Sequence, residues 1–587
     1  TALGAIVGMG YGRGAYAQTF TIDSEETIQN GGETLDGGDT LAITSAGSLE
    51  IDTDQAPYAA VTGTGSSNTV MNAGRISVTT TGVGSFTDRY GFLYDASKGQ
   101  GVALDGSASR VTNNGQIVIT STDAGANGAN RGITLNDLDG AQVVNGGSIS
   151  ITTSAGAGGA SGDPENGANY AIYGYAPSVA NDVVIRNEGQ IDIQVNGSNG
   201  NSSQGGNRGI RLMGAYNDTT NSYEGTFNNM TVSNDGEIRI VSSEGGNRGV
   251  MISGNGDNIL LRNTGLIDID AGVAGDGGAG GNRGFHFSDV DGYMRAENSG
   301  RIEISATGGG NRAFHLTDVR DMYLINSGSI DIDVDGGGTR GIQLSPQYGG
   351  TATVINSGNI TVDSQEGGIR GIMMTGYANS PYVLNSGRIE VTGESYGLRG
   401  IMARASGLDA DYNVVGGEAL VVNTGYISVT GTGSTRGIEL KDWSYEADTR
   451  VVNRGTIIVS STSTTTNGIE VLAGGEGNTA TVTNSGTVIS NYYSIELDNN
   501  SGAAGVINLE AGSVLVGDIE IANHDTATIN FGPGLNAIVR MEDVTDGSDV
   551  PAQINVTDGE YVVEGDTIYV ASNQSFAAVD TGRVIQN

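Results

Sequence analysis

Short stretches in which apolar and polar residues alternate recur along almost the whole chain. In one of them, Ile330 and Ile332 alternate with Asp331 and Asp333. In an extended strand, the two isoleucines face one side and the two aspartates the other. The three-to-four-residue spacing of apolar side chains that is typical of an amphipathic helix does not occur. The pattern therefore predicts many short β-strands with one buried face each, and it excludes helical solenoids.

The expected strands belong to an internal repeat. A phrase close to Asn-x-Gly-x-Ile-x-Ile begins at thirteen asparagines that are 28 to 47 residues apart: Asn72, Asn113, Asn145, Asn187, Asn234, Asn263, Asn298, Asn326, Asn356, Asn385, Asn423, Asn453 and Asn484. A second phrase, arginine followed by Gly or Ala and an apolar residue, begins at Arg131, Arg208, Arg248, Arg283, Arg312, Arg340, Arg370, Arg399 and Arg436. A third apolar stretch leads into the next asparagine. Each period thus holds three strands with turns between them.

The repeat predicts the fold. No single strand buries enough apolar surface to be stable, so equivalent strands of successive periods must stack. We expect an all-β, single-stranded parallel β-helix, right-handed by analogy with crossover connections, with a core column of Ile, Val and Leu. About 16 coils of at least about 29 residues, each rising about 4.8 Å, predict a rod on the order of 80 Å long.

Four regions are expected along the chain. Residues 1–17 resemble the end of a secretory signal, because Ala15-Tyr16-Ala17 fits the small-residue cleavage pattern. Residues 18–70 form N-terminal entry coils, residues 71–497 the regular array with insertion loops, and residues 498–587 the last coils and a distinct cap. A cap is expected because the open end of a β-helix exposes unpaired backbone.

The repeated polar residues are expected to act in the turns. Asparagine tolerates the left-handed conformation, and stacked asparagines form amide ladders. The glycine two residues later is expected to allow the tight bend. Stacked arginines repel one another, and strict alternation would place Arg340 on the face of Ile342. We expect alternation to break at this corner and the guanidinium groups to bond turn carbonyls or neighbouring acids. The alternative is a stripe of arginines that binds anions or glycans.

Charge and composition exclude several classes of function. The 28 basic and 66 acidic residues give 28 − 66 = −38, which argues against nucleic-acid binding. The absence of cysteine excludes disulfides and thiolate zinc sites. Outward acidic pairs such as Asp268/Asp270 and Asp331/Asp333 could attract Ca²⁺. No calcium-binding motif accompanies them, and a solvated acidic face is the alternative.

Motifs for catalysis and metal binding are weak. Gly393-Glu394-Ser395-Tyr396-Gly397 matches G-x-S-x-G, but it lies in a turn before a strand and not at a strand-to-helix elbow. We therefore expect no catalytic residue and no cofactor. His286 and His315 hold equivalent outward positions in adjacent coils and are expected to stack about 5 Å apart. They are candidates for a metal pair or a pH-sensitive contact, and otherwise ordinary surface residues.

The sequence resembles the passenger region of Gram-negative autotransporters, the type V secretion family, of the adhesin-like β-helical kind. The resemblance rests on the signal-like start, the coils of the form N-S-G-x-I, and an ending composed of INLEAGSVLVGDIEI, ATINFGPG and TIYVASNQSFAAVDTG. It implies export, surface display and an outer-membrane barrel beyond residue 587. It does not determine the activity, because such passengers include adhesins, aggregation factors, proteases and esterases.

We therefore expect a non-enzymatic extracellular rod on the bacterial cell surface. It would serve adhesion, self-association, or a surface coat or filament. Its partners would be further copies of the chain, glycans, or ligands on host or other cell surfaces. Two alternatives remain open: a polysaccharide-active enzyme on a β-helical scaffold, and a passive spacer.

Overall fold

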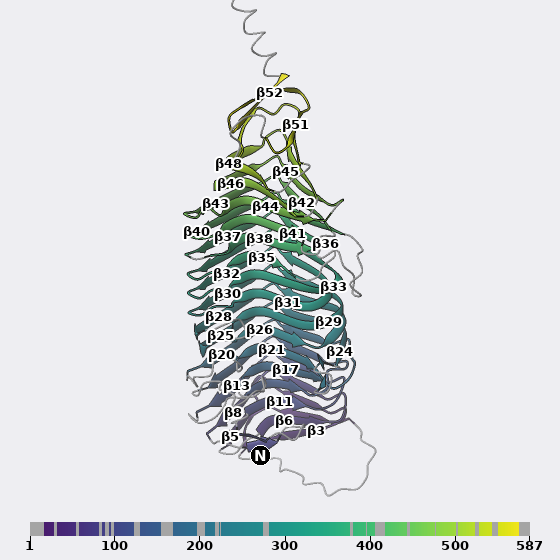
Figure 1. Cartoon of the computed structure of the whole chain (residues 1–587). Coiled ribbons are helices and arrows are strands. Elements are labelled where there is room, and N and C mark those ends of the chain that lie inside the picture. The colour runs from purple at the N-terminus through teal and green to yellow at the C-terminus, as the bar shows by residue number, and fades with distance from the viewer. Residues whose placement is uncertain are drawn as a thin grey trace, which may run out of the picture.

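The protein is a long parallel β-helix, built in this computed structural model from β-strands alone in the part that is described. The described residues are 17–28, 32–53, 58–81, 85–87, 93–95, 99–122, 130–153, 168–196, 206–217, 222–223, 225–273, 281–375, 380–394, 396–405, 417–442, 447–475, 477–500, 503–522, 527–542 and 550–573. Of 53 strands, 46 join one sheet that winds along the chain. Figure 1 shows the coils stacked into a rod from the N-terminal end upward. The prediction of an all-β parallel β-helix is confirmed.

Each regular coil has three faces. The first face follows the Asn-x-Gly turn, as in β30 (Arg301–Ala306). The second begins at the repeated arginine, and the third ends at the next asparagine. In β31 (Arg312–Asn326) the second and third faces are one continuous strand, with irregular pairing where it bends.

The strands of the large sheet follow one another in this order. The first face contains β2 (Glu25–Ile28), β5 (Ser48–Thr53), β8 (Arg75–Thr80), β13 (Gln116–Ser121), β16 (Ser148–Thr153), β20 (Gln190–Val195), β25 (Glu237–Glu244), β28 (Leu266–Val273), β30, β32 (Ser329–Val334), β34 (Asn359–Ser364), β37 (Arg388–Gly393), β40 (Tyr426–Gly431) and β43 (Thr456–Ser461). The second contains β3 (Glu33–Asp36), β6 (Tyr58–Thr64), β11 (Gly99–Leu104), β14 (Arg131–Leu135), β17 (Tyr170–Ala176), β21 (Arg208–Gly214), β26 (Arg248–Ser253), β35 (Arg370–Met374), β38 (Leu398–Ala405), β41 (Thr435–Asp442) and β44 (Thr466–Gly474). The third contains β1 (Thr19–Ile22), β4 (Thr40–Ile43), β7 (Thr69–Asn72), β12 (Arg110–Asn113), β15 (Gln142–Asn145), β18 (Ala180–Asn181), β19 (Val184–Asn187), β24 (Thr226–Asn234), β27 (Asn255–Asn263), β36 (Ser380–Asn385), β39 (Glu418–Asn423), β42 (Asp448–Asn453), β45 (Thr479–Asn484), β47 (Ala504–Leu509), β49 (Ala527–Phe531) and β51 (Gln553–Val556). Strands that span two faces are β29 (Arg283–Asn298), β31, β33 (Arg340–Asn356), β46 (Thr487–Asn500) and β48 (Val514–Ala522).

The core is a column in which each apolar side chain stacks on its equivalent in the next coil. Ile302 pairs in register with Ile330, and Ile330 with Ile360. All three are at most 1% exposed. Phe285 and Phe314 stack with ring centroids 5.1 Å apart. Burial of each such side chain contributes roughly 1.5–3 kcal/mol, so the stability of the rod is distributed evenly over its coils.

A continuous ladder of asparagine amides runs beside this core. In each of the twelve steps between the thirteen repeat asparagines, Nδ2 of one donates to Oδ1 of the next, at 2.7–2.8 Å. All thirteen side chains are at most 2% exposed. Because every amide donates in the same direction along the rod, the bonds polarise one another.

The repeat glycines are required by close approach of the backbone and not by a special conformation. A Cβ atom at Gly328 would lie 2.1 Å from the carbonyl oxygen of Gly300, and one at Gly300 would lie 2.0 Å from that of Gly265. None of these three glycines has a positive φ angle. The glycines do lie at bends, as expected, but lack of space requires them there and a left-handed backbone does not. Adjacent turns are too close for any side chain.

The two ends of the described rod differ. Among the described strands, β1, β2 and β3 pair only with the coil that follows them. At the other end, β50 (Ala537–Arg540), β53 (Thr567–Ser572) and β52 (Gly559–Glu564) form an antiparallel sheet. Short antiparallel hairpins also join β9 (Ser85–Thr87) to β10 (Leu93–Asp95), and β22 (Tyr216–Asn217) to β23 (Ser222–Tyr223). The expected signal remnant lies outside the described residues, except for Ala17.

The antiparallel sheet covers the C-terminal end of the core column. Val539, Ile568 and Val570 belong to the same buried cluster as the coils. Its other side carries Ile538 and Val562, which are 67% and 65% exposed. The sheet thus protects the last coil while presenting an apolar surface of its own.

We predict that Asn326→Ala destabilises the protein by about 2–3 kcal/mol, because it leaves the amides of Asn298 and Asn356 without one partner each in a dry environment. Urea unfolding followed by circular dichroism measures the change. Asn359→Ala is the matched control, since this asparagine is exposed on β34; its effect should stay within about 0.5 kcal/mol. Equal effects of the two substitutions would contradict the role of the ladder.

Candidate functional site

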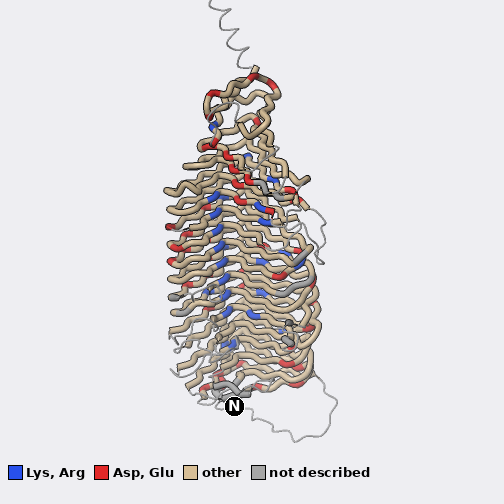
Figure 2. Tube along the Cα trace, in the orientation of Figure 1, with Lys and Arg blue, Asp and Glu red and all other residues tan. Residues whose placement is uncertain are grey.

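Eight arginines form one uninterrupted column at the start of the second face, which we call the arginine column. They pair in register from coil to coil: Arg208, Arg248, Arg283, Arg312, Arg340, Arg370, Arg399 and Arg436. Figure 2 shows this run of basic residues along the rod, with acidic residues continuing above it. Arg131 stands apart, because Tyr170 occupies the position between it and Arg208, and its guanidinium lies 3.9 Å from the ring centroid of Tyr173.

Four arginines in the middle of the column are each held by two contacts of the same kind. Nη1 of Arg312 donates to the carbonyl oxygen of Gly310 at 2.6 Å, and Nε donates to Oε1 of Gln343 in the next coil at 2.5 Å. Arg340 bonds Gly338 and Sδ of Met373 in the same way, at 2.6 and 2.7 Å. Arg248 and Arg370 repeat the pattern. The guanidinium groups are therefore fixed in place before any ligand binds.

Local sequence explains this arrangement. The glycine two residues before the arginine adopts a positive φ, +81° at Gly310 and +74° at Gly338, which few other residues tolerate. The residue after each arginine is skipped in the pairing between coils, so alternation breaks there. As a result, Ile342 enters the core while Arg340 lies outside it. The expected break at this corner and the expected bonds to turn carbonyls are both present.

A second asparagine ladder, which our reading of the repeat missed, runs directly beside the column. Asn130, Asn169, Asn207, Asn247, Asn282 and Asn311 donate from Nδ2 to Oδ1 of the next at 2.9–3.1 Å. All six are at most 1% exposed. The signal for five of the six was Asn immediately before Arg-Gly or Arg-Ala, whereas Asn169 precedes Tyr170-Ala171. This ladder anchors the strand end from which the arginines project.

The middle of the column forms no ion pair with an acid of the described residues. The second-face segments 208–214, 248–253, 283–288, 312–317, 340–345 and 370–374 hold seven arginines and no acid. No carboxylate of the described residues lies within 4.0 Å of a guanidinium nitrogen of Arg248, Arg312, Arg340 or Arg370. Burial and then neighbouring arginines lower the pKa of Arg312 and of Arg370 to about 9. Keeping the buried guanidinium groups of Arg312 and Arg370 positively charged therefore costs free energy.

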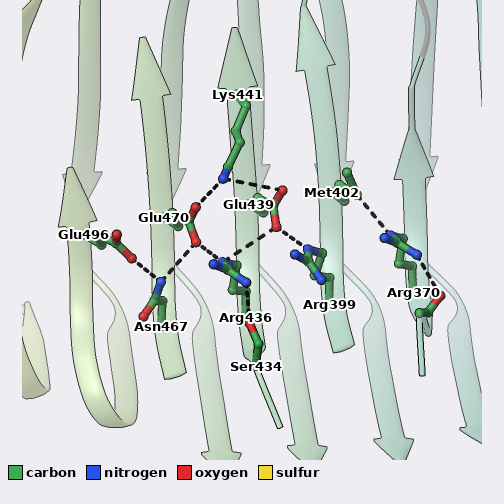
Figure 3. Close-up of polar contacts among 11 residues, drawn as sticks. Arg370, Arg399, Met402, Ser434, Arg436, Glu439, Lys441, Asn467, Glu470 and Glu496 are labelled. Carbon is green, nitrogen blue, oxygen red and sulfur yellow. Dashed lines mark hydrogen bonds and ion pairs between the residues drawn. The ribbon is translucent and has the colours of Figure 1, made fainter. Parts of the chain in front are cut away.

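In the part of the chain that the structure describes, the column forms ion pairs with acids only at its C-terminal end (Figure 3). Glu439 lies in register with Met402, and Glu470 and Glu496 follow in the next coils. Arg399 bonds Glu439, and Arg436 bonds Glu470. Nζ of Lys441 lies 2.5 Å from Oε1 of Glu470. This cluster of alternating charges neutralises the last two arginines.

Buried acids in this cluster have opposite pKa shifts. Burial alone would raise the pKa of Glu439, but Arg399, Lys441 and Arg436 lower it below its ordinary value. Burial raises the pKa of Glu496, which Arg436 only partly counteracts. Glu439 is therefore the carboxylate on which the cations of the cluster depend.

His286 and His315 lie in a second column of side chains beside the arginine column, in register with Met251 and Gln343. Farther along, the same column contains Glu439, but in these coils it is uncharged. The two histidine rings stack with centroids 5.0 Å apart and an angle of 15°, the separation that the repeat predicts. Both are half-buried and not freely outward. Burial and the charges of nearby arginines lower the pKa of His286 and of His315. Nδ1 of His286 accepts a hydrogen bond from Nε of Arg248 at 3.2 Å, so this ring contacts a cation.

The other candidate sites do not converge. Asp268, Glu303 and Asp331 pair in register over three coils before Thr361 ends the run. Asp333 pairs with Asp363 alone among acids, so the acidic ladders are short. Among the described residues, no three His, Cys, Asp or Glu side chains are placed to hold a metal ion. Ser395 of the G-x-S-x-G match lies outside the described residues. A shallow groove of about 990 Å³ follows the Asn-x-Gly turns from Ser45 to Glu237, lined mainly by glycine and serine.

Comparison with protein-family models, with curated protein sequences and with solved structures gave no match. Within the part of the chain that is described, no helix is long and apolar enough to span a membrane.

We predict that Glu439→Gln destabilises the protein by about 3 kcal/mol, because it leaves buried cations without their counter-charge. Urea unfolding measures the change. Glu390→Gln is the control, since its pair with Arg388 is solvent-exposed, and its effect should be below about 0.5 kcal/mol. If Glu439→Gln left the stability unchanged, the cluster would not depend on this carboxylate.

Stability should also depend on the histidines as the pH falls from 7 to 5. Because the pKa values of His286 and His315 are lowered in the folded state, protons bind mainly to the unfolded chain. Their contribution is present above about pH 6.5 and is lost below it, on the order of 1 kcal/mol per histidine. Between pH 7 and pH 5, the urea midpoint of unfolding should fall less for the double variant His286→Gln/His315→Gln than for the unaltered chain. Equal losses would contradict this prediction.

Proposed function

We propose that this protein is a non-enzymatic, extracellular rod of the bacterial cell surface that acts by adhesion and self-association. The observation that carries the proposal is the regular repetition of surface side chains in columns, among them the eight arginines in register. Such columns offer the same contact in coil after coil. An extended or repeating partner can use all of them, whereas catalysis needs a few groups that converge on one bond.

Two further features support self-association. The apolar surface of the C-terminal sheet exposes Ile538 and Val562, and exposed apolar patches favour contact between proteins. At the opposite end, β1, β2 and β3 have neighbours on one side only among the described strands, and such edges accept further strands. Contact between unlike ends would repeat without closing and give filaments.

Export to the cell surface is proposed on the resemblance to autotransporter passengers. The signal-like start and the form of the last coils support it. A net charge of −38 would keep neighbouring rods soluble and apart until specific contacts form.

Negative-stain electron microscopy of the purified chain, with and without Ca²⁺, tests the proposal. We expect filaments or side-by-side arrays. Ile538→Asp/Val562→Asp should abolish end-to-end contacts, because it places charge on the apolar sheet. Gln190→Asp/Asn359→Asp adds the same charge at exposed positions of the first face and should leave assembly unchanged. Single rods under all conditions, combined with no binding to cells, would overturn the proposed function.

A further inference from the structure

Four arginines in the middle of the column keep one amino group for a ligand. In Arg248, Arg312, Arg340 and Arg370, Nη1 and Nε are used within the protein. Their Nη2 groups bond no described residue and are not sealed from solvent. A guanidinium that is already desolvated and fixed binds an oxyanion with little further loss of entropy or hydration.

The regular spacing favours a linear polymer as the ligand. The free groups of Arg312, Arg340 and Arg370 lie in successive coils, about 4.8 Å apart along a straight line, and that of Arg248 lies two coils before Arg312. Small anions bound at that spacing would repel one another as the arginines do. Anionic groups joined along one extended chain neutralise successive arginines together, and each added contact is intramolecular after the first.

The chemistry beside the column favours a sugar chain. The neighbouring column is uncharged along the same coils, with Met251, His286, His315, Gln343, Met373 and Met402 in register. Amide and imidazole groups both donate and accept hydrogen bonds, which suits the hydroxyl groups of a sugar. The side chains of this neutral column are methionine, glutamine and histidine, without the tyrosine or phenylalanine platforms on which nucleobases stack.

We propose that the arginine column from Arg248 to Arg370 binds one linear acidic polysaccharide along the rod axis, through its carboxylate or sulfate groups. This inference goes beyond the proposed function, since it would hold whether or not the rods assemble. The acidic cluster at Glu439 sets the C-terminal limit of the bound segment, because carboxylates there already occupy the last arginines. The rest of the acidic surface repels the same polymer, so binding is confined to this column.

Isothermal titration calorimetry of the full chain tests the proposal, with polygalacturonate as the carboxylated probe and heparin as the sulfated probe. At least one should bind at low salt, and binding should weaken as salt screens the contacts. Arg312→Gln/Arg340→Gln/Arg370→Gln should weaken binding at least tenfold. This variant is expected to fold, because Asn467 occupies an equivalent position of the same column.

Arg262→Gln/Arg301→Gln/Arg388→Gln is the matched control. It removes the same charge from exposed positions outside the column and should change the affinity less than twofold. If the triple column variant does not fold, Arg340→Gln alone should still weaken binding severalfold. Sodium sulfate should not compete at equal charge concentration, and neutral dextran should not bind.

Four outcomes would overturn the proposal. They are the failure of both acidic polymers to bind, equal affinity of the column variant and the control variant, equal binding of dextran, and equally tight binding of single-stranded DNA. Because electron microscopy tests assembly separately, loss of polymer binding and loss of assembly are distinguishable results.

Discussion

The structure depends on the in-register stacking of equivalent coils. Parallel pairing places every side chain about 4.8 Å from its equivalent above and below, so each residue type must be compatible with itself. Isoleucine and phenylalanine satisfy this by packing, as Phe285 and Phe314 do. Asparagine satisfies it because an amide is both donor and acceptor. Glycine satisfies it where adjacent turns leave no room, as at Gly328. The residues of the repeat phrase are those that satisfy the requirement in these three ways.

Arginine does not satisfy this requirement, because stacked guanidinium groups repel one another. A column of arginines therefore needs a separate explanation. The fold limits the cost by bonding six of the eight guanidinium groups to the carbonyl of a glycine two residues earlier, as Arg312 does with Gly310. Only the last coils add true counter-charges, in Glu439 and Glu470. In a chain with 66 acidic residues, carboxylates could have neutralised the whole column. Their restriction to one end leaves a cationic strip where an external anion gains the most.

The strip and the ends of the rod suggest two independent uses of one scaffold. The C-terminal sheet offers apolar contact through Ile538 and Val562, suited to another copy of the chain. The arginine column offers fixed charges at a constant interval, suited to a linear polymer. A surface protein that both assembles and retains an acidic polysaccharide would join cells to a shared matrix.

Much of this could be predicted from sequence, because in a stacked repeat the neighbours of a residue are copies of itself. The three repeated phrases were enough to predict three parallel strands per coil and a ladder of asparagine amides, and the phrase Arg-x-Phe-His predicted the stacking of His286 on His315. The sequence alone could not decide why the glycines recur or which arginines meet acids. The reason for the recurring glycines depends on how closely adjacent turns approach each other. Which arginines meet acids depends on the register between coils whose lengths vary from 28 to 47 residues. Only the tertiary structure brings Glu439 beside Arg399, 40 residues away, and leaves Arg312 without a carboxylate.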